Sequence, residues 1–138
     1  MIDLTQFDHI NTQLGHVAGD KILRQFSRAL LREIGDEHII GRLYNDKFAI
    51  LINTITDLSN ACELLERVQK FVDSYPIEGI KERTSLGGAL AGVLVMGDYP
   101  ITPESVFEHL DESIYIAKHS DEYQLIVIKN PDDNQQVA

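Results

Sequence analysis

The sequence is poor in cysteine, in long apolar runs and in basic residues, and each shortage excludes a class of protein. Its single cysteine, Cys62, rules out an internal disulfide framework and is typical of a reducing compartment. No apolar stretch approaches the roughly 20 residues that a membrane-spanning helix needs. The first residues show no signal-peptide pattern either. We therefore expect a cytoplasmic domain that makes no membrane contact.

Basic residues are outnumbered by acidic ones, 12 to 22, and the formal net charge is −10. Nucleic acids and anionic membranes attract proteins through positively charged surface, so neither is expected as the main partner. A local phosphate pocket remains open as an alternative. With 138 residues, the chain has the length of one ordinary domain with a real core.

Apolar periodicity predicts elements in the order strand, helix, helix, strand, strand, helix, strand, helix, strand. The expected strands are 1–4, 37–43, 47–53, 84–96 and 125–128, and the expected helices are 6–14, 20–34, 59–75 and 103–118. Gly35 and Pro76 are expected to end two of the helices. Asp57 with Ser59, and Thr102 followed by Pro103, are start signals for the last two.

This order predicts an α/β fold with a mixed, mostly antiparallel sheet of about five strands and helices packed on its faces. Residues 1–129 are expected to form the domain. Residues 130–138 are polar and low in apolar content, which is typical of a linker or tail.

The segment 42–48 lies between two apolar runs and indicates a β-hairpin. Asn45 and Asp46 tolerate the left-handed backbone of a tight turn. Asp3 ends the first strand, so it would face Asp46 if that strand lies beside the hairpin. Paired carboxylates at one sheet edge can hold Mg²⁺, which prefers oxygen ligands.

Three further residues fall where such a fold places a site. Asn11 and Asp20 flank the turn between the first two helices, and Lys118 ends the last helix. Each has an ordinary structural alternative. Asp46 fits turn chemistry, Asp20 fits a helix N-cap, and Lys118 fits the negative end of a helix dipole. Spacing alone favours these alternatives.

Taken together, these motifs resemble the GGDEF family, the diguanylate cyclase domain of bacterial cyclic-di-GMP signalling. Residues 3–16 resemble D-x-D-x-F-K-x-I-N-D-x-x-G-H, and residues 19–23 resemble G-D-x-x-L. Residues 42–48, RLYNDKF, fall where R-x-G-G-D-E-F belongs. Residues 85–87 resemble S-I-G, and 111–118 resemble D-x-A-L-Y-x-A-K. The resemblance implies a nucleotidyl cyclase-like fold with a ferredoxin-like core.

The resemblance also implies roles, position by position. Asp3 and Asp46 match metal-binding carboxylates, Asn11 and Asp20 match guanine-reading residues, and Lys118 matches a phosphate contact. In the family, two domains each bring one GTP and together make cyclic-di-GMP. The family's N-terminal helix and most of its first strand have no counterpart here, which indicates a piece of a longer protein.

Departures from the family pattern are concentrated at positions near the triphosphate of the GTP that the family binds. Tyr44 and Asn45 replace both glycines, although glycine there lets nucleotide pass close to the backbone. Lys47 replaces the second acid, Asp8 stands in place of a lysine, and Glu122 stands in place of an arginine. Lys47 could instead pair with the metal-binding carboxylates and substitute for Mg²⁺.

The inhibitory product site is missing as well, because Gly35 and His38 occupy the R-x-x-D positions. The resemblance with these losses implies a catalytically degenerate domain that acts as a regulatory or interaction module. The degenerate loop, Tyr44 to Phe48, is expected to carry no catalysis. A GTP-binding sensor without turnover and an active cyclase are the alternatives.

The expected partner is an adjoining domain, either an EAL-type phosphodiesterase or a sensory input, or a separate protein. GTP, if bound at all, would bind weakly, and pairing of two copies stays open. No cofactor is expected, and Mg²⁺ would be present only if nucleotide binding is retained.

Overall fold

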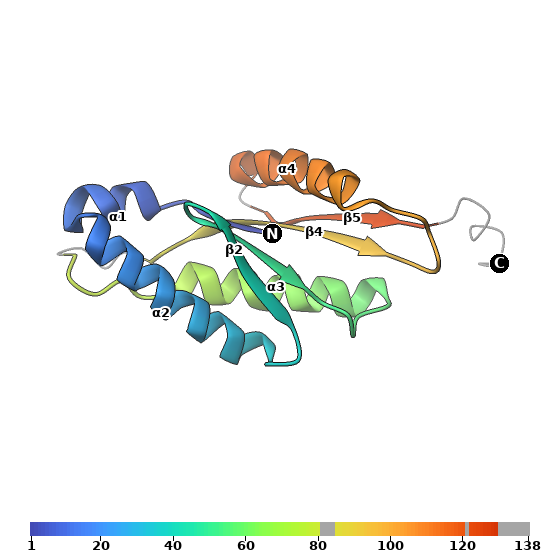
Figure 1. The fold of residues 1–138 in the computed structure, drawn as a ribbon, viewed down its shortest axis with the longest axis horizontal. Coiled ribbons are helices and arrows are strands. Elements are labelled where there is room, and N and C mark those ends of the chain that lie inside the picture. Colours follow the sequence, from blue (N-terminus) through green and yellow to red (C-terminus); the bar gives the residue numbers. More distant parts are fainter. Residues whose placement is uncertain (81–84, 121, 130–138) are drawn as a thin grey trace.

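A five-stranded sheet forms the centre of the protein (Figure 1). The computed structural model describes residues 1–80, 85–120 and 122–129. The strands are β1 (Ile2–Leu4), β2 (Ile39–Tyr44), β3 (Lys47–Leu51), β4 (Gly88–Val95) and β5 (Gln124–Ile128). Their spatial order is β2-β3-β1-β4-β5, and only β4 and β5 run parallel. The predicted mixed, mostly antiparallel sheet is confirmed.

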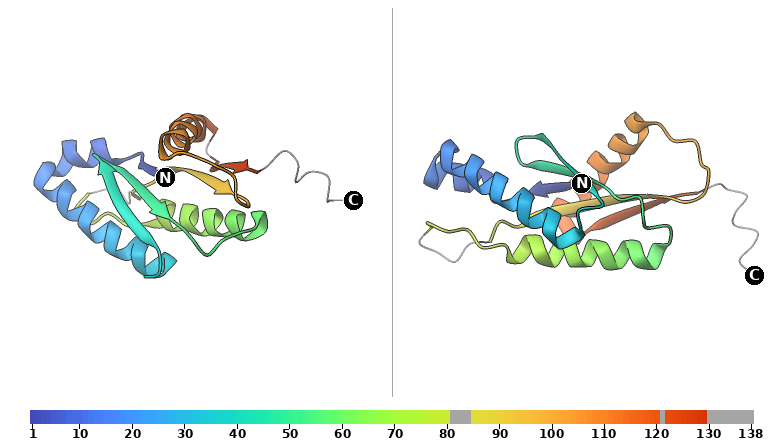
Figure 2. Two further views of the ribbon diagram at one scale, coloured as in Figure 1. Left: turned by 45° about the vertical axis from the view of Figure 1, so that its right-hand side comes forward. Right: turned by 60° about the horizontal axis from the view of Figure 1, so that its bottom comes forward.

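Helices cover both faces of this sheet. They are α1 (Phe7–Leu14), α2 (His16–Ile34), α3 (Leu58–Ser74) and α4 (Pro103–Ser120). Figure 2 shows α3 and α4 on opposite sides of β4 and β5. Successive side chains of a strand point to opposite faces of the sheet. Ile2 and Leu4 belong to the core under α1, α2 and α3, whereas Met1 belongs to the core under α4. Asp3 therefore points to the α4 side.

Phe26 of α2 fixes the hairpin in place. Its ring is fully buried and lies edge-on to Phe48 of β3, with centroids 5.4 Å apart. Phe71 and Tyr75 contact the same ring, with centroids 6.0 and 5.3 Å away. Such aromatic clusters bury much surface in defined geometry, so the hairpin is held against α2 and α3.

The predicted helix starts of α3 and α4 are confirmed. The Asp57 carboxylate accepts a hydrogen bond from the Asn60 backbone N–H at 2.9 Å. The Thr102 hydroxyl oxygen accepts one from the Ser105 N–H at 3.2 Å. Each bond satisfies a donor that would otherwise lack a partner in the first helical turn.

The predicted start of α2 is wrong. The helix begins at His16 rather than at Asp20, so Asp20 lies in the second turn and is no N-cap. Apolar periodicity missed the first turn because its buried residue is Gly19, which has no side chain, while Val17 is 88% exposed. Gly15 alone separates the two helices, and its φ of 83° belongs to the region that glycine adopts readily.

The strand expected over 84–96 is shorter, from Gly88 to Val95. Residues before it bond outside the strand ladder instead. The Leu86 N–H donates to the Tyr75 carbonyl, and the Leu86 and Gly87 carbonyls accept from the N–H groups of Gln6 and Thr5. Gly87 also has a φ of 59°. Thr84 and the expected tail, 130–138, lie outside the described residues. Among the described helices, none is long and apolar enough to cross a membrane.

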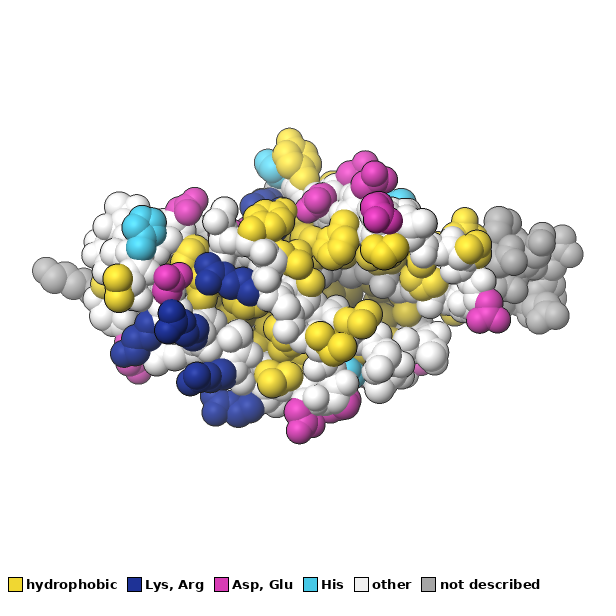
Figure 3. Space-filling view, viewed as in Figure 1, with side chains coloured by type: hydrophobic (Ala, Val, Ile, Leu, Met, Phe, Trp, Pro, Cys, Tyr) yellow, Lys and Arg dark blue, Asp and Glu magenta, His cyan; other side chains and the backbone are white. Residues whose placement is uncertain are grey.

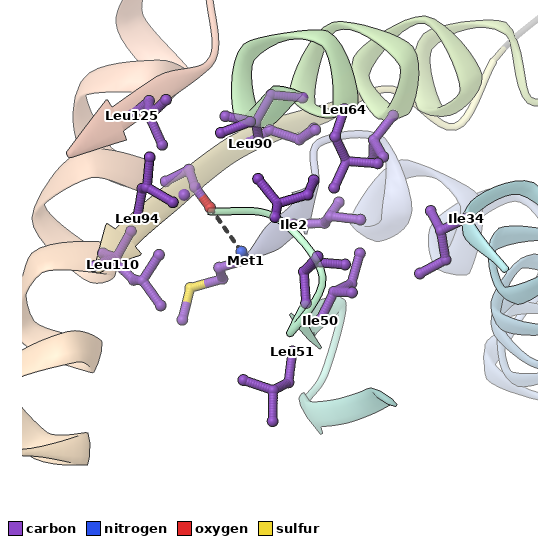
Figure 4. A pocket seen from close by; sticks show the side chains of 18 of the residues that line it. Met1, Ile2, Ile34, Ile50, Leu51, Leu64, Leu90, Leu94, Leu110 and Leu125 are labelled. Atoms are coloured by element: carbon purple, nitrogen blue, oxygen red, sulfur yellow. Dashed lines mark hydrogen bonds between the residues drawn. The ribbon is translucent and has the colours of Figure 1, made fainter. Parts of the chain in front are cut away.

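An apolar cavity of about 210 Å³ lies beside β1, between β3 and β4 (Figure 4). Met1 lies among the lining residues, and its amino group donates to the Ala91 carbonyl at 2.7 Å. Leu51 of β3 and Leu110 of α4 also line the cavity. The cavity thus lies at the start of β1, among the hairpin, β4, α3 and α4.

Candidate functional site

The hairpin tip joins β2 and β3 through Asn45 and Asp46. Asn45 has a φ of 49°, the left-handed conformation that asparagine tolerates better than most residues. The Arg42 Nε donates to the Asn45 carbonyl at 2.7 Å, and the register shifts between Arg42 and Tyr44. The tip is therefore an ordered turn, and the residues that follow Asn45, namely Asp46 and Lys47, lie beside β1.

Asp3 and Asp46 come together because β1 lies beside β3. Asp3 is opposite Lys47 in the sheet, and the Leu4 N–H donates to the Asp46 carbonyl at 3.2 Å. Asp3 is 3% exposed. Burial and the Asp3 charge, in that order, raise the pKa of Asp46 above its ordinary value. Two carboxylates thus repel one another at this site.

We expect Asp46→Asn to stabilise the protein modestly at neutral pH. A carboxyl with a raised folded pKa binds its proton more tightly in the native state, so its ionisation costs stability above that pKa. The group is partly exposed, so the gain should stay below about 1 kcal/mol.

The gain should vanish as pH falls below the unfolded pKa of about 3.9, where the carboxyl is protonated in both states. Urea unfolding between pH 3 and pH 7 measures it, with exposed Asp98→Asn as the control. An equal gain at both ends of the range would contradict the prediction.

Two ammonium groups face the Asp3 carboxylate. The Lys118 Nζ of α4 lies 2.8 Å from the Asp3 Oδ2, and the Lys47 Nζ lies 3.9 Å from the same atom. Lys47 also contacts Asp111 of α4 at 3.4 Å and the Tyr44 hydroxyl at 3.0 Å. This set, Asp3, Lys47, Asp111, Lys118 and Tyr44, is called the lysine cluster below.

Lys47 stays charged inside the lysine cluster. Burial acts to lower its pKa, but hydrogen bonds and charge interactions with Tyr44 and Asp111 outweigh burial and raise the pKa above its ordinary value. Its Nζ also lies 5.1 Å from the centre of the Tyr44 ring, within cation–π range. The ammonium is therefore a fixed positive charge beside Asp3.

The site does not fit Mg²⁺. The Asp3 Oδ2 that would bind the cation already contacts the ammonium groups of both Lys118 and Lys47. Mg²⁺ needs several oxygen ligands, and a neighbouring ammonium repels it. Within 1–80, 85–120 and 122–129, no three His, Cys, Asp or Glu side chains gather as a metal site would require.

Asn11 lies at the contact of α1 with α2. Its Oδ1 is buried and has no hydrogen-bond partner among the described residues. A Cβ on Gly19 would come 2.0 Å from this oxygen and 3.2 Å from the ring of Phe7. The missing side chain of Gly19 therefore makes room for Asn11.

We expect Gly19→Ala to destabilise the protein by about 1–2 kcal/mol, because the new methyl group must push Asn11 out of its place. Chemical denaturation measures the change. Ala18→Gly, one position earlier, is the matched control and should cost about 1 kcal/mol through helix propensity alone. A Gly19→Ala protein as stable as the wild type would show that Asn11 moves freely.

Asp20 is engaged with the hairpin. Its Oδ1 lies 3.8 Å from Nη1 of Arg42, and both side chains are about half exposed. The pair joins α2 to the residue that holds the turn at Asn45. The structure thus places Asp20 near the hairpin tip, and Asn11 on the helix before it.

Two replaced positions also lie close to the site. Asp8 is near enough for its charge to raise the pKa of Asp46. Glu122 and Lys118 line a small pocket of about 170 Å³ beside β4. Both acids add negative charge to the surroundings of Asp46 and Lys118.

Sequence reasoning gave no role to Asp111 or to Arg42, although both hold the site together. A signal for Asp111 was present, because it precedes Lys118 by seven residues and so lies on the same face of a helix. The signal for Arg42 was its match to the first position of R-x-G-G-D-E-F, and that match predicted no contact for it.

Comparison with known proteins gives consistent matches. A family model described as "Diguanylate cyclase, GGDEF domain" matches residues 1–124. Diguanylate cyclase DgcP of Pseudomonas aeruginosa is 28% identical over 120 residues, which cover 87% of this chain and 17% of DgcP. Response regulator PleD of Caulobacter vibrioides is 29% identical over 121 residues, covering 87% of this chain and 26% of PleD. The chain thus spans about a quarter or less of these relatives.

Solved structures share the fold. Diguanylate cyclase SiaD of Pseudomonas aeruginosa, solved with its activator SiaC, superposes with a TM-score of 0.73 at 22% identity. That match covers 92% of this chain and 48% of SiaD. A sensory box/GGDEF family protein from Caulobacter crescentus CB15 gives a TM-score of 0.67 at 27% identity, covering 86% and 76%.

Proposed function

We propose that this chain, which belongs to the GGDEF family of diguanylate cyclase domains, is a catalytically degenerate member. It would serve as a regulatory or interaction module in bacterial cyclic-di-GMP signalling. Support comes from two sides: the fold is that of the family, and the Lys47 ammonium at the hairpin tip opposes the binding of a divalent cation.

Lys47 carries the proposal. Its ammonium lies 3.9 Å from Asp3 and 3.4 Å from Asp111, where a divalent cation would need carboxylates and open coordination positions. Without a cation, the negative charge of a triphosphate would meet Asp3, Asp8 and Asp46. Phosphoryl chemistry depends on electrostatic stabilisation of that charge, so turnover is not expected.

Tyr44 supports the same conclusion by its size. It is 54% exposed at the tip, and its hydroxyl and ring both contact the Lys47 ammonium. A glycine in this position would leave the backbone open to close approach by a ligand. Tyr44 fills part of that space and also holds Lys47 in place.

The partner we propose is an adjoining domain or a separate signalling protein. One structural neighbour is described as an EAL/GGDEF domain protein from M. capsulatus, with a TM-score of 0.64. SiaD was solved with an activator protein. An EAL-type phosphodiesterase domain or a sensory input domain would therefore suit, as a partner, a GGDEF domain that no longer catalyses a reaction.

A product assay tests the proposal. The protein is incubated with GTP and Mg²⁺, then with GTP and Mn²⁺, and cyclic-di-GMP is measured by chromatography. We expect no product above a no-enzyme blank under conditions in which an active GGDEF domain converts its GTP. Cyclic-di-GMP formed at rates comparable with that control would refute the proposal.

One observation favours a second candidate, GTP binding without turnover. The buried Oδ1 of Asn11 has no donor among the described residues, and a bound base could supply one. Calorimetry with GTP in the presence of a chelator tests it, with Asn11→Ala as the matched variant. A heat of GTP binding that disappears in Asn11→Ala would support this second candidate. No heat at millimolar GTP would rule it out.

A further inference from the structure

Lys and Arg side chains gather over α2 (Figure 3). Lys21, Arg28 and Arg32 of this helix line a groove of about 790 Å³ between α2 and the segment 75–79, which follows α3. Ligand-binding clefts are commonly of this size. Among the described residues that line the groove, none belongs to the lysine cluster, so binding there would be independent of the loss of catalysis proposed above.

The groove combines apolar and basic side chains. Apolar side chains that are partly or fully buried come from Leu14, Ala18, Ile22, Tyr75 and Ile77. The side chains of Lys21, Arg28 and Arg32 are exposed. Glu78 is the one carboxylate among the described residues of the lining, so positive charge dominates there in a protein whose net charge is −10. A ligand that is both apolar and acidic therefore matches the lining.

The basic side chains of the groove are not neutralised within the described part of the chain. No ion pair there includes Lys21, Arg28 or Arg32. Burial raises the pKa of Tyr75 above its ordinary value, while the Arg32 charge acts to lower this pKa and the Glu78 charge to raise it. Arg32 and Glu78 thus both lie near Tyr75, yet they form no ion pair with each other. The three cations can therefore pair with carboxylates of a ligand.

The groove follows α2 over much of its length. The α2 residues that line it, each three or four positions from another, are Ala18, Lys21, Ile22, Gln25, Arg28 and Arg32. Residues at this spacing share one face of a helix. Residues 18 to 32 correspond to about 21 Å of helix, at about 1.5 Å per residue. That length matches about four turns of a second helix and is greater than a small anionic ligand covers.

We propose that this groove binds an acidic amphipathic helix of a partner protein. The apolar face of the partner helix contacts Ala18 and Ile22, and its carboxylates pair with the basic side chains of the groove. Lys21 and Arg28 are seven residues apart, and Arg28 and Arg32 are four residues apart. Carboxylates at the same spacings on the partner helix lie on one of its faces and can pair with all three cations.

An acidic helix fits the groove better than other anionic ligands do. An anionic membrane or a nucleic acid would be repelled by the net charge of −10. A flat lipid surface cannot enter a groove either. A single phosphate or carboxylate group would pair with one or two of the cations and would leave the apolar side chains of the lining uncovered.

Fluorescence anisotropy with a labelled peptide tests this proposal on the whole chain. The probe is a helix of about 15 residues, with leucine at helical spacing and glutamate at the other positions. At about 0.1 M NaCl we expect saturable binding of this glutamate peptide. A scrambled peptide of the same composition should bind at least about tenfold more weakly, because it has no apolar face. No saturable binding of the glutamate peptide, or equal binding of the scrambled peptide, overturns the proposal.

Charge reversal locates the binding. Arg28→Glu/Arg32→Glu should weaken binding of the glutamate peptide at least about tenfold, because two attractive contacts become repulsive. The same variant should bind a lysine version of the peptide more tightly than the wild type does, which also shows that the variant is folded. Lys70→Glu/Lys129→Glu makes the same charge change outside the groove and should leave binding of the glutamate peptide within about twofold of the wild type. Unchanged binding by Arg28→Glu/Arg32→Glu, or an equal loss in both double variants, shows that the peptide binds elsewhere and overturns the proposal.

Inorganic tripolyphosphate distinguishes a helix-binding groove from a phosphate site. At an ionic strength matched with NaCl, it should displace no more of the glutamate peptide than NaCl does, because it cannot cover the apolar side chains of the lining. Displacement by tripolyphosphate under conditions in which NaCl has no effect would show that the three cations form a phosphate site, and it would overturn the proposal.

Discussion

Lys47→Glu is expected to convert the protein into one whose stability depends on divalent cations. The change removes the ammonium that contacts Asp3, Asp111 and Tyr44. It places a further carboxylate beside Asp3, Asp46 and Asp111, while Lys118 remains the ammonium contact of Asp3. In the absence of metal we expect a loss of about 2–3 kcal/mol of unfolding free energy, because buried like charges repel.

Cations should reverse that loss. A ligand that binds only the folded state stabilises it by about 2.7 kcal/mol at 100 times its dissociation constant. Adding Mn²⁺ or Mg²⁺ should therefore raise the melting temperature of Lys47→Glu and leave that of the wild type unchanged. Thermal unfolding followed by circular dichroism, with and without each cation, measures both.

Lys47→Gln is the matched control, because it removes the ammonium without adding a carboxylate. It should lose less stability than Lys47→Glu and show no response to cations. If Lys47→Glu melts at the same temperature with and without Mn²⁺, the tip does not recreate a metal site, and Lys47 is not what excludes the cation.

Asp3→Asn is expected to cost about 3 kcal/mol of unfolding free energy. Its carboxylate is almost fully buried and faces the ammonium groups of both Lys118 and Lys47. Removing one member of a buried ion pair leaves the remaining charges uncompensated, which typically costs 3–5 kcal/mol. The lower end applies because Lys118 is 40% exposed and can turn toward water.

Urea denaturation at pH 7 measures the loss. Asp111→Asn is the control, because Asp111 also pairs with Lys47 but is 54% exposed, so its removal should cost less than about 1 kcal/mol. Equal losses for the two variants would contradict the role we assign to Asp3 as the centre of the lysine cluster.

Much of the fold was predictable because its signals are local. Stripes of apolar residues marked the helices, Asp57 and Thr102 marked helix starts, and the apolar runs around Asp46 marked the hairpin. The start of α2 was not predictable, because its first turn buries only Gly19 and exposes Val17, so it carries no apolar periodicity.

The candidate site was predictable in part. Asp3 and Asp46 meet because β1 lies beside β3, which the hairpin argument anticipated. The order of the strands and the side of the sheet that α4 covers are long-range properties, however, and they decide which cation reaches Asp3. Spacing along the chain could not show that Lys118 lies 2.8 Å from it, or that Asp111 holds Lys47.

Titration of the wild-type protein with Mn²⁺, followed by the electron paramagnetic resonance signal of the free ion, tests the central claim most directly. We predict that the free-ion signal rises as in buffer up to millimolar Mn²⁺, because the Lys47 ammonium occupies the place of the cation. Stoichiometric loss of that signal in the wild type, abolished by Asp3→Asn, would contradict the account.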